Sequence, residues 1–275
     1  MPAHPLTELN TFRGGMCVQR RFARLSNGLI RLDQDTRSAC AGTGLDVSGP
    51  YWIFAIVSPR LGRVSYFHGR ELVHPPGTPY GVFFPPYSVV QCRLDQVQSQ
   101  SRAVAGRAVL PPDHPRQPVA FEVAGSCLPG SVEEILGILR TRRVLVAIGR
   151  ERNPSPLSHR VKALIDEGFR DLPPLSVLAA KLHTSPAVMS RYFTRDYGMP
   201  PVRYRHAIRV MDALMRLIAG EPVAQVAGQA GFDDLGQFYR QFGRLALAPP
   251  GRYRLPSGDR ADAQRWPISS DNVIR

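Results

Sequence analysis

The C-terminal part of the chain contains a short arginine pattern that occurs twice. Arg191 lies two residues before Phe193, and Arg240 lies two residues before Phe242, at an interval of 49 residues. An arginine guanidinium can donate two hydrogen bonds to O6 and N7 of guanine in the major groove. Two such arginines in a repeated pattern therefore suggest two separate contacts with DNA bases.

The first arginine falls in a predicted helix that follows a shorter helix and a tight turn. Apolar residues at helical spacing occupy Leu175–Leu182. Ser185 is a favoured N-cap, and Pro186 suits the first helical position because its missing N–H needs no partner there. We expect this second helix to run to about Tyr197 and to end at Gly198.

The second arginine falls in a similar unit. Pro222 begins a short helix, and either Asp233 or Asp234 can cap the helix that carries Arg240. The succession of helix, turn and helix thus occurs twice. In helix-turn-helix units the second helix enters the major groove of DNA, while the first crosses the backbone.

A long helix is predicted to join the two units. Pro200 and Pro201 open it, apolar residues follow at helical spacing as far as Ile218, and Gly220 ends it. At about 1.5 Å per residue, about 19 residues span about 28 Å, which is close to the ~34 Å of one turn of DNA. Both recognition helices could therefore reach adjacent segments of the major groove.

A set of residues at fixed spacings runs through both units. They are Leu178, Ala179, Ser185, Met189, Arg191, Phe193, Gly198, Tyr204, Arg209, Ala213, Val226, Ala227, Gly231, Phe232, Asp234, Phe238, Arg240, Phe242, Pro249, Tyr253 and Arg254. In these residues the segment 158–255 resembles the DNA-binding domain of the AraC/XylS family of bacterial transcriptional regulators. The resemblance implies seven helices, two recognition helices and promoter binding, with a variable N-terminal domain for effector sensing or dimerisation. The sequence departs from the family pattern at Gly236, Gln237 and Gly243.

We expect the two units to contact both bases and phosphates. The candidates for base contact are Ala187, Ser190, Arg191, Leu235, Gln237, Arg240 and Gln241. The candidates for phosphate contact are Ser185, Arg195, Arg203, Arg205 and Arg244. For the arginines the alternatives are internal ion pairs or solvated surface charges, and Arg191 could also clamp a phosphate. Met189 and Phe193 are expected in the core because of their helical spacing.

The N-terminal half has a different pattern. Short apolar and β-branched runs alternate with Gly and Pro, which is typical of a β sandwich or barrel. The runs are Gly28–Leu32, Tyr51–Val57, Arg63–Phe67, Tyr80–Phe84, Ser88–Leu94 and Arg102–Leu110. Ser131 and Glu134 form a capping box for a helix, which either continues through Val144–Ile148 or gives way there to a strand.

The prolines within Asn153–Pro156 mark a boundary, because each disfavours helix in the residue before it. We therefore predict an α+β protein of several domains. A β-rich, cupin-like domain spans 1–152, a linker 153–157, an all-α domain with two helix-turn-helix units joined by a long helix 158–255, and a disordered tail 256–275.

Part of the β-rich half is similar to the cupin-like sensory domains often joined to this DNA-binding unit. The similar segments are Tyr66–Arg70, Pro75–Gly77 and Tyr80–Phe84. His68 and His74 do not form the closely paired His-x-His of metal-binding cupins, so we expect no metal. Six aromatic residues either line an apolar effector pocket or form the core of the domain: Tyr51, Trp52, Phe54, Tyr66, Phe83 and Tyr87.

The chain carries an excess of positive charge. Its 35 Lys and Arg residues outnumber 22 Asp and Glu residues, which gives a net charge of +13. Such a balance favours a polyanionic partner, either nucleic acid or an anionic membrane surface, although the arginine excess can also reflect the base composition of a genome. Because the charge is spread over both halves, the repeated units locate the DNA site better than the charge does.

Other kinds of chemistry are not predicted. The four cysteines, Cys17, Cys40, Cys92 and Cys127, form no C-x-x-C pair, and neither a phosphate-binding loop nor a G-x-S-x-G motif occurs. The sequence has no run of about 18 apolar residues and no secretory signal. We therefore expect a cytoplasmic protein with no cofactor and no enzyme activity.

The sequence thus predicts a DNA-binding transcriptional regulator whose N-terminal domain controls the two recognition helices. The expected partners are double-stranded promoter DNA, RNA polymerase, an unknown small-molecule effector and a second copy in a homodimer, but no membrane. One alternative is that the N-terminal domain only dimerises and binds no effector. The other is a DNA repair or modifying enzyme that carries this DNA-binding unit, which would need a reactive cysteine.

Overall fold

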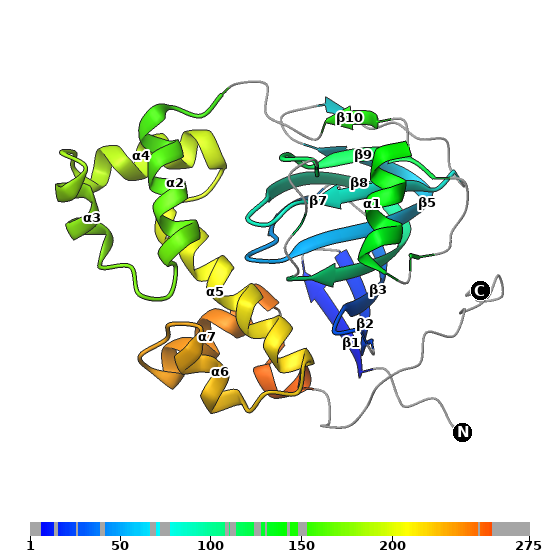
Figure 1. Cartoon of the computed structure of the whole chain (residues 1–275). Helices are drawn as coiled ribbons and strands as arrows, with labels where there is room; N and C mark the ends of the chain where they lie inside the picture. The colour runs from blue at the N-terminus through cyan, green and yellow to red at the C-terminus, as the bar shows by residue number, and fades with distance from the viewer. Residues whose placement is uncertain are drawn as a thin grey trace.

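The computed structural model shows a curved β-sheet and a group of helices that pack against each other (Figure 1). The residues it describes are 7–13, 16–25, 27–38, 42–66, 70–71, 78–107, 110, 114–123, 128–129, 131–141, 144–147, 153–246 and 248–254. The strands come from the N-terminal half and the helix-turn-helix units from the C-terminal half, so the predicted fold class is confirmed. The tail expected at 256–275 lies outside the described residues.

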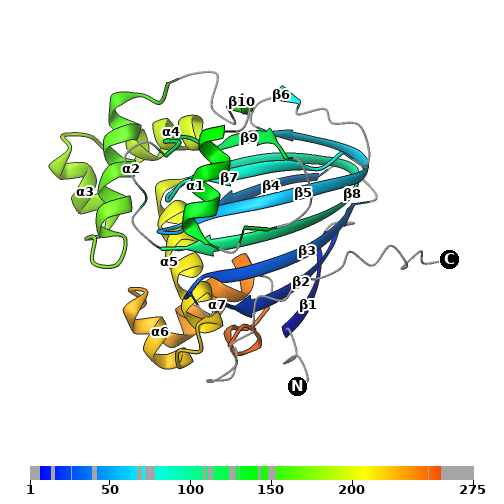
Figure 2. The same ribbon diagram turned by 45° about the vertical axis from the view of Figure 1, so that its right-hand side comes forward.

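The strands form a ten-stranded antiparallel sheet that curves around its own core (Figure 2). Its main order is β1-β2-β3-β8-β5-β7-β9-β10, with β4 paired to β8 and β6 paired to β5. The strands are β1 (Thr7–Arg13), β2 (Met16–Arg24), β3 (Ile30–Ser38), β4 (Gly42–Val47), β5 (Trp52–Tyr66), β6 (Arg70–Glu71), β7 (Tyr80–Phe84), β8 (Val89–Gly106), β9 (Val119–Glu122) and β10 (Val144–Ala147).

Four of the predicted runs merge into two long strands, β5 and β8, which bend together. Their pairing shifts register on either side of Leu61, close to Pro59, whose missing N–H is tolerated at such an irregularity. Gly62 has φ +82°, and a Cβ there would lie 2.4 Å from the carbonyl oxygens of Asp95 and Gln96. The bend therefore requires glycine at this position.

Helix α1 (Val132–Thr141) covers one face of the sheet, and its Ile135 is fully buried. As predicted, the backbone N–H of Glu134 donates to Oγ of Ser131 at 3.2 Å. The helix ends at Thr141 and β10 follows, so of the two alternatives for Val144–Ile148 the strand is correct. The core beneath α1 contains Leu29, Trp52, Phe54, Ile56, Phe83, Val104, Val119 and Phe121.

The helical part contains both predicted units. They are α3 with α4 and α6 with α7, and α5 joins them. The described helices are α2 (Pro156–Gly168), α3 (Leu175–Lys181), α4 (Pro186–Tyr197), α5 (Pro201–Ile218), α6 (Val223–Gln229), α7 (Leu235–Ala246) and a short 3-10 helix at Pro250–Arg252. Helix α2 begins at Pro156, within the segment expected as a linker, because Ser155 caps it. Among the described residues, no helix combines the length and apolar character needed to cross a membrane.

Helix α5 lies at the centre of the helical part and also contacts the sheet. Ten of its 18 residues are buried. Near its N-terminus, Tyr204 and Ile208 pack in one cluster with Phe193 of α4. Near its C-terminus, residues including Leu217 pack in a second cluster with Phe238 of α7. Each unit therefore completes its core with a different half of the same helix.

The turns of the two units share a backbone conformation. His183 and Gly231 both have positive φ, +51° and +86°. The next N–H in each turn closes the same type of hydrogen bond, from Thr184 to the Ala179 carbonyl at 3.0 Å and from Phe232 to Ala227 at 3.1 Å. The repeat therefore extends to the backbone of the turns.

After this point the second turn is one residue longer. Ser185 caps α4 by accepting from the N–H of Val188 at 3.2 Å. In the second unit Asp234, and not Asp233, accepts from the N–H of Gln237 at 2.7 Å. Asp234 is therefore the cap of α7, and the hydrogen bonds that it accepts from the N–H groups of Gln237 and Gly236 lower the pKa of its carboxyl.

Asp196 of α4 fastens this helix to the start of α2. Its Oδ2 accepts from the backbone N–H and the hydroxyl of Ser155, at 2.9 and 2.7 Å, and its Oδ1 accepts from Nε of Arg195 at 2.9 Å. Burial by itself would raise the pKa of this carboxyl, but the hydrogen bonds from Arg195, Ser155 and Ser158 outweigh burial. Its pKa therefore lies well below the ordinary value of 3.8.

Gly231→Ala is expected to destabilise the helical part. A Cβ at this left-handed position would lie 2.6 Å from the carbonyl oxygen of Arg170, so backbone strain of about 1–2 kcal/mol is increased by a clash. Gly228→Ala is the control, because a Cβ there meets nothing within 4 Å and alanine favours the helix by about 1 kcal/mol. Thermal unfolding should show a lower Tm for Gly231→Ala and an equal or higher Tm for Gly228→Ala. A lower Tm for both variants would contradict this role of Gly231.

Asp196→Asn is expected to change how stability depends on pH. Since the pKa of Asp196 is lowered on folding, its carboxylate stabilises the fold above the unfolded pKa, and this stabilisation is lost as pH falls through the folded pKa. The difference in Tm between wild type and Asp196→Asn should therefore narrow below about pH 4. Glu167→Gln, a change at an exposed carboxylate of α2, is the control. A difference that stays constant into acid would refute the assignment.

Candidate nucleic-acid interface

Helix α4 turns one face inward and leaves the predicted contact face outside. Met189, Phe193 and Tyr197 are buried, and the first two lie in the core as expected. On the other side Ala187 and Arg191 are exposed, and Ser190 is half-buried. The three candidate base contacts of this helix therefore remain accessible to DNA.

Helix α7 is arranged in the same way. Phe238, Phe242 and Ala246 are buried. The four predicted base contacts divide into two exposed residues and two half-buried ones: Leu235, Arg240, Gln237 and Gln241. Nη2 of Arg240 lies 3.7 Å from the capping carboxylate of Asp234, but its side chain is 72% exposed. An exposed ion pair of this kind contributes little and can be exchanged for a contact with DNA.

Four of the five candidate phosphate contacts lie at the surface. Arg203 and Arg244 are exposed, and within the described part of the chain neither makes a hydrogen bond or an ion pair. Arg195 pairs with Asp196, yet its side chain is 58% exposed. Ser185 is exposed at the start of α4, and since its oxygen accepts the capping bond its O–H can still donate.

Arg205 is the exception, because its side chain is half-buried and donates hydrogen bonds within the fold. Its Nε donates to the carbonyl of Phe169 at 2.8 Å and its Nη2 donates to the carbonyl of Arg170 at 3.3 Å. Arg209, one turn further along α5, donates to the same two carbonyls at 2.8 and 2.6 Å. Both arginines thus close the C-terminal end of α2, where backbone carbonyls lack partners within the helix. Arg205 therefore has a structural role in the fold, and its contact with a phosphate stays a prediction.

Two tyrosines on the recognition helices were not among the predicted contacts. The ring of Tyr192 has the guanidinium carbons of Arg191 and Arg195 at 5.6 and 4.7 Å from its centre. Tyr239 is 48% exposed, and Leu235 one turn before it is 49% exposed. Each tyrosine directly adjoins an arginine in the sequence, and the two guanidinium groups near Tyr192 lie within the range of cation–π contact.

Five of the six aromatic residues considered for an effector pocket have described side chains, and these five fall into separate clusters. Trp52, Phe54 and Phe83 are fully buried in the packed cluster beneath α1, so their alternative as core residues is correct. Tyr51 and Tyr87 belong instead to the contact with the helical part. Tyr66 lies in β5, and its side chain is outside the described residues. The five described side chains therefore do not line one common pocket.

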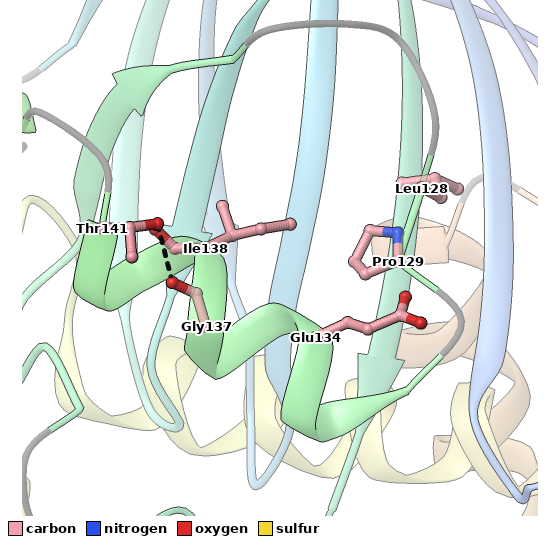
Figure 3. Close-up of a pocket in the computed structure, with 6 residues that line it drawn as sticks. All are labelled: Leu128, Pro129, Glu134, Gly137, Ile138 and Thr141. Carbon is pink, nitrogen blue, oxygen red and sulfur yellow. Dashed lines mark hydrogen bonds between the residues drawn. The ribbon is translucent and has the colours of Figure 1, made fainter.

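A different, open groove lies between α1 and the segment before it (Figure 3). Its volume is 480 Å³, and it is lined by Leu128, Pro129, Glu134, Gly137, Ile138 and Thr141. None of the six aromatic residues lines it. Of the segments that resemble cupin-like domains, Tyr80–Phe84 forms β7, whereas His68, His74 and Pro75–Gly77 lie outside the described residues. Cys17 is free.

Comparison with known proteins agrees with the repeated units. The family model described as a helix-turn-helix domain matches residues 178–255, from α3 to the end of the described helices. A search of curated proteins found no match.

Among solved structures the chain is similar to the following three. The C-terminal domain of AraT, a response regulator from Geobacillus stearothermophilus, is 26% identical over 38% of this chain and 87% of that domain, with a TM-score of 0.35. The C-terminal domain of the two-component response regulator yesN from Fusobacterium nucleatum is 28% identical over 37% of this chain and 100% of that one, with a TM-score of 0.35. ToxT from Vibrio cholerae with a bound unsaturated fatty acid is 12% identical over 79% of this chain and 95% of that one, with a TM-score of 0.41.

The identification rests on the family model together with the residues themselves. The matched segment contains both turns with a positive φ, both capping residues and the helix that joins the units. Residues 178–255 are therefore a helix-turn-helix domain of the AraC type, and this domain supports the role of a DNA-binding transcriptional regulator for the chain.

Proposed function

We propose that the chain binds a promoter with α4 and α7 in two adjacent segments of the major groove. The observation that carries this proposal is the pair of outward faces on helices whose opposite faces pack on one helix, α5. With 18 residues α5 is about 27 Å long, close to the ~34 Å between successive major-groove segments on one side of DNA.

In this proposal the exposed residues divide into those that read bases and those that hold the backbone. Base contacts come from Ala187, Ser190, Arg191, Leu235, Gln237, Arg240 and Gln241. Phosphate contacts come from Ser185, Arg195, Arg203 and Arg244. Phosphate contacts fix position and make binding dependent on salt, whereas base contacts select the sequence.

The β-rich domain is the regulatory part in this proposal. Its contact with α5 gives it a direct route to both units. A small-molecule effector, a homodimer and an interaction with RNA polymerase stay predictions that follow from the family resemblance.

Substitutions should separate the two kinds of contact. Arg191→Ala and Gln237→Ala are each expected to weaken binding to the preferred DNA by about 1–3 kcal/mol, because a contact with a base edge is lost. Arg244→Ala should weaken binding to all DNA equally and reduce the salt slope by about 1. The measurement is the Kd for a DNA site selected by the protein and for random DNA, over a range of salt concentrations.

The control for lost positive charge is Arg60→Ala. Arg60 is exposed on β5 and donates to Gln100, in the sheet and not on either recognition helix. It should leave the preference for the selected site unchanged. If all the variants weaken binding to selected and random DNA equally, Arg191 and Gln237 do not read bases.

A further inference from the structure

A buried carboxylate on α5 gathers polar groups from three parts of the chain. The side chain of Asp212 has no exposed surface. Its Oδ2 lies 2.9 Å from Nη2 of Arg170 and 3.8 Å from Nε of Arg216. Its Oδ1 lies 3.5 Å from Nη1 of Arg107 and also accepts the hydroxyl of Tyr51 at 3.5 Å. A buried charge requires such partners, since leaving it unpaired is strongly unfavourable.

Two of these partners connect the helix-turn-helix units. Arg170 lies between α2 and α3, on the side of the first unit, and its buried Nε has no hydrogen-bond partner. Its guanidinium is therefore held by Asp212 and by the ring of Phe169, 4.8 Å away. Arg216 also lies 3.5 Å from Glu221 and donates to Gln229 of α6, in the second unit. One carboxylate is thus tied to both units.

The other two partners belong to the β-rich domain. Tyr51 directly precedes β5, and Arg107 directly follows β8. Burial, followed by the charge of Asp212, raises the pKa of Tyr51, so its hydroxyl stays protonated and able to donate. The cation of Arg107 also lies 5.7 Å from the centre of the Tyr51 ring. Both groups reach the carboxylate from strand ends.

Two loops fix the position of these strand ends on α5. The loop at 48–51 and the loop at 85–88 are joined because the N–H of Tyr87 donates to the Gly49 carbonyl at 2.6 Å and the N–H of Ser88 donates to Oγ of Ser48 at 2.9 Å. Gly49 has φ +59°, and a Cβ there would lie 3.1 Å from Cγ of Met211. The β-rich domain therefore meets α5 directly beside Asp212.

The recognition faces stay open while the β-rich domain is docked in this way. Among the described residues, Arg191 and Arg240 are both exposed. The described part of the domain therefore does not cover these two arginines, and its contact around Asp212 can influence DNA binding through α5.

We propose that Asp212 is a positioning residue through which the β-rich domain sets the separation of the two recognition helices on DNA. This proposal rests on the proposed DNA-binding function. Arg170 and Arg216 hold each unit to the carboxylate, and Tyr51 and Arg107 complete its environment. When the Tyr51 hydroxyl or the Arg107 guanidinium is lost, the separation of α4 and α7 is less strictly fixed, although neither helix is altered.

The test measures how strictly the full chain requires one spacing between the two DNA segments that α4 and α7 contact. A DNA site selected by the wild-type chain from a random library is compared with versions that carry one or two extra base pairs between the two contacted segments. The variants are Tyr51→Phe and Arg107→Ala. The control is Arg31→Ala, which removes an arginine that pairs with Asp33 inside the sheet at 3.0 Å. Circular dichroism and thermal unfolding are used to check that each variant is folded.

The wild type and Arg31→Ala should bind the lengthened sites poorly. The penalty for insertion is the factor by which Kd rises when base pairs are added to the selected site. This factor should be at least about fivefold smaller in Tyr51→Phe and Arg107→Ala, in line with the usual size of coupling between sites. A folded Arg107→Ala and a folded Tyr51→Phe with the wild-type penalty would overturn the proposal. Failure of the wild type to select any sequence would instead contradict the DNA-binding function on which it rests.

A pair of glycines provides a second, independent test. Gly49 and Gly28 both have positive φ, so alanine introduces similar backbone strain at each. At Gly49 the added Cβ presses on Met211, whereas at Gly28 it meets nothing within 4 Å. Gly49→Ala should reduce the penalty for insertion as Arg107→Ala does, and Gly28→Ala should leave it at the wild-type level. The same penalty in both would count against control through this contact.

Discussion

The burial of α5 is the constraint on which the rest of the molecule depends. A recognition unit of two short helices cannot enclose a core alone, and here each unit is completed by part of this helix. Tyr204 and Ile208 serve the first unit, and Leu217 and Ile218 serve the second. Each side chain of this size contributes about 1.5–3 kcal/mol when it is fully buried. The units are therefore held in place by packing and not by the short loops that connect them.

A helix that is buried along most of its length must also satisfy the polar residues it carries. Arg209 does so by donating to the carbonyls at the end of α2, and Asp212 does so with cations from several segments. Because the hydrogen bonds of these groups are directional, they fix the orientation of the packed helices, which apolar contact alone would allow to slide. The polar residues of α5 therefore fix how the two units are oriented, while its apolar residues stabilise their packing.

The sequence allowed the helical part to be predicted closely because its signals act within one turn of the chain. Ser185 with Pro186 marks the start of α4, and Gly198 with φ +72° marks its end. The first two strands were not predicted: β2 combines three arginines with apolar residues such as Val18 and Phe22, and turn signals around it are weak. Its apolar residues are explained only by what they pack against.

In the candidate site, too, the features set by short-range signals could be predicted and those set by long-range contacts could not. The outward faces of α4 and α7 could be predicted from helical periodicity alone. The structural role of Arg205 could not be predicted in this way, since its acceptors, the carbonyls of Phe169 and Arg170, lie in the connection between α2 and α3. The cluster around Asp212 was equally hidden, because it joins this residue to Tyr51, 161 residues away. Contacts of such long range depend on the complete fold.

The docking of the loops at 48–51 and 85–88 on α5 has a consequence for hybrid regulators. Exchanging the N-terminal half for that of a relative would replace Gly49, Tyr51 and Tyr87 at once, while their counterparts Met211, Asp212 and Tyr204 stayed behind. A crossover in the segment between the halves would therefore separate surfaces that fit each other. Functional chimeras of this protein need these two loops to be transplanted together with the helical half.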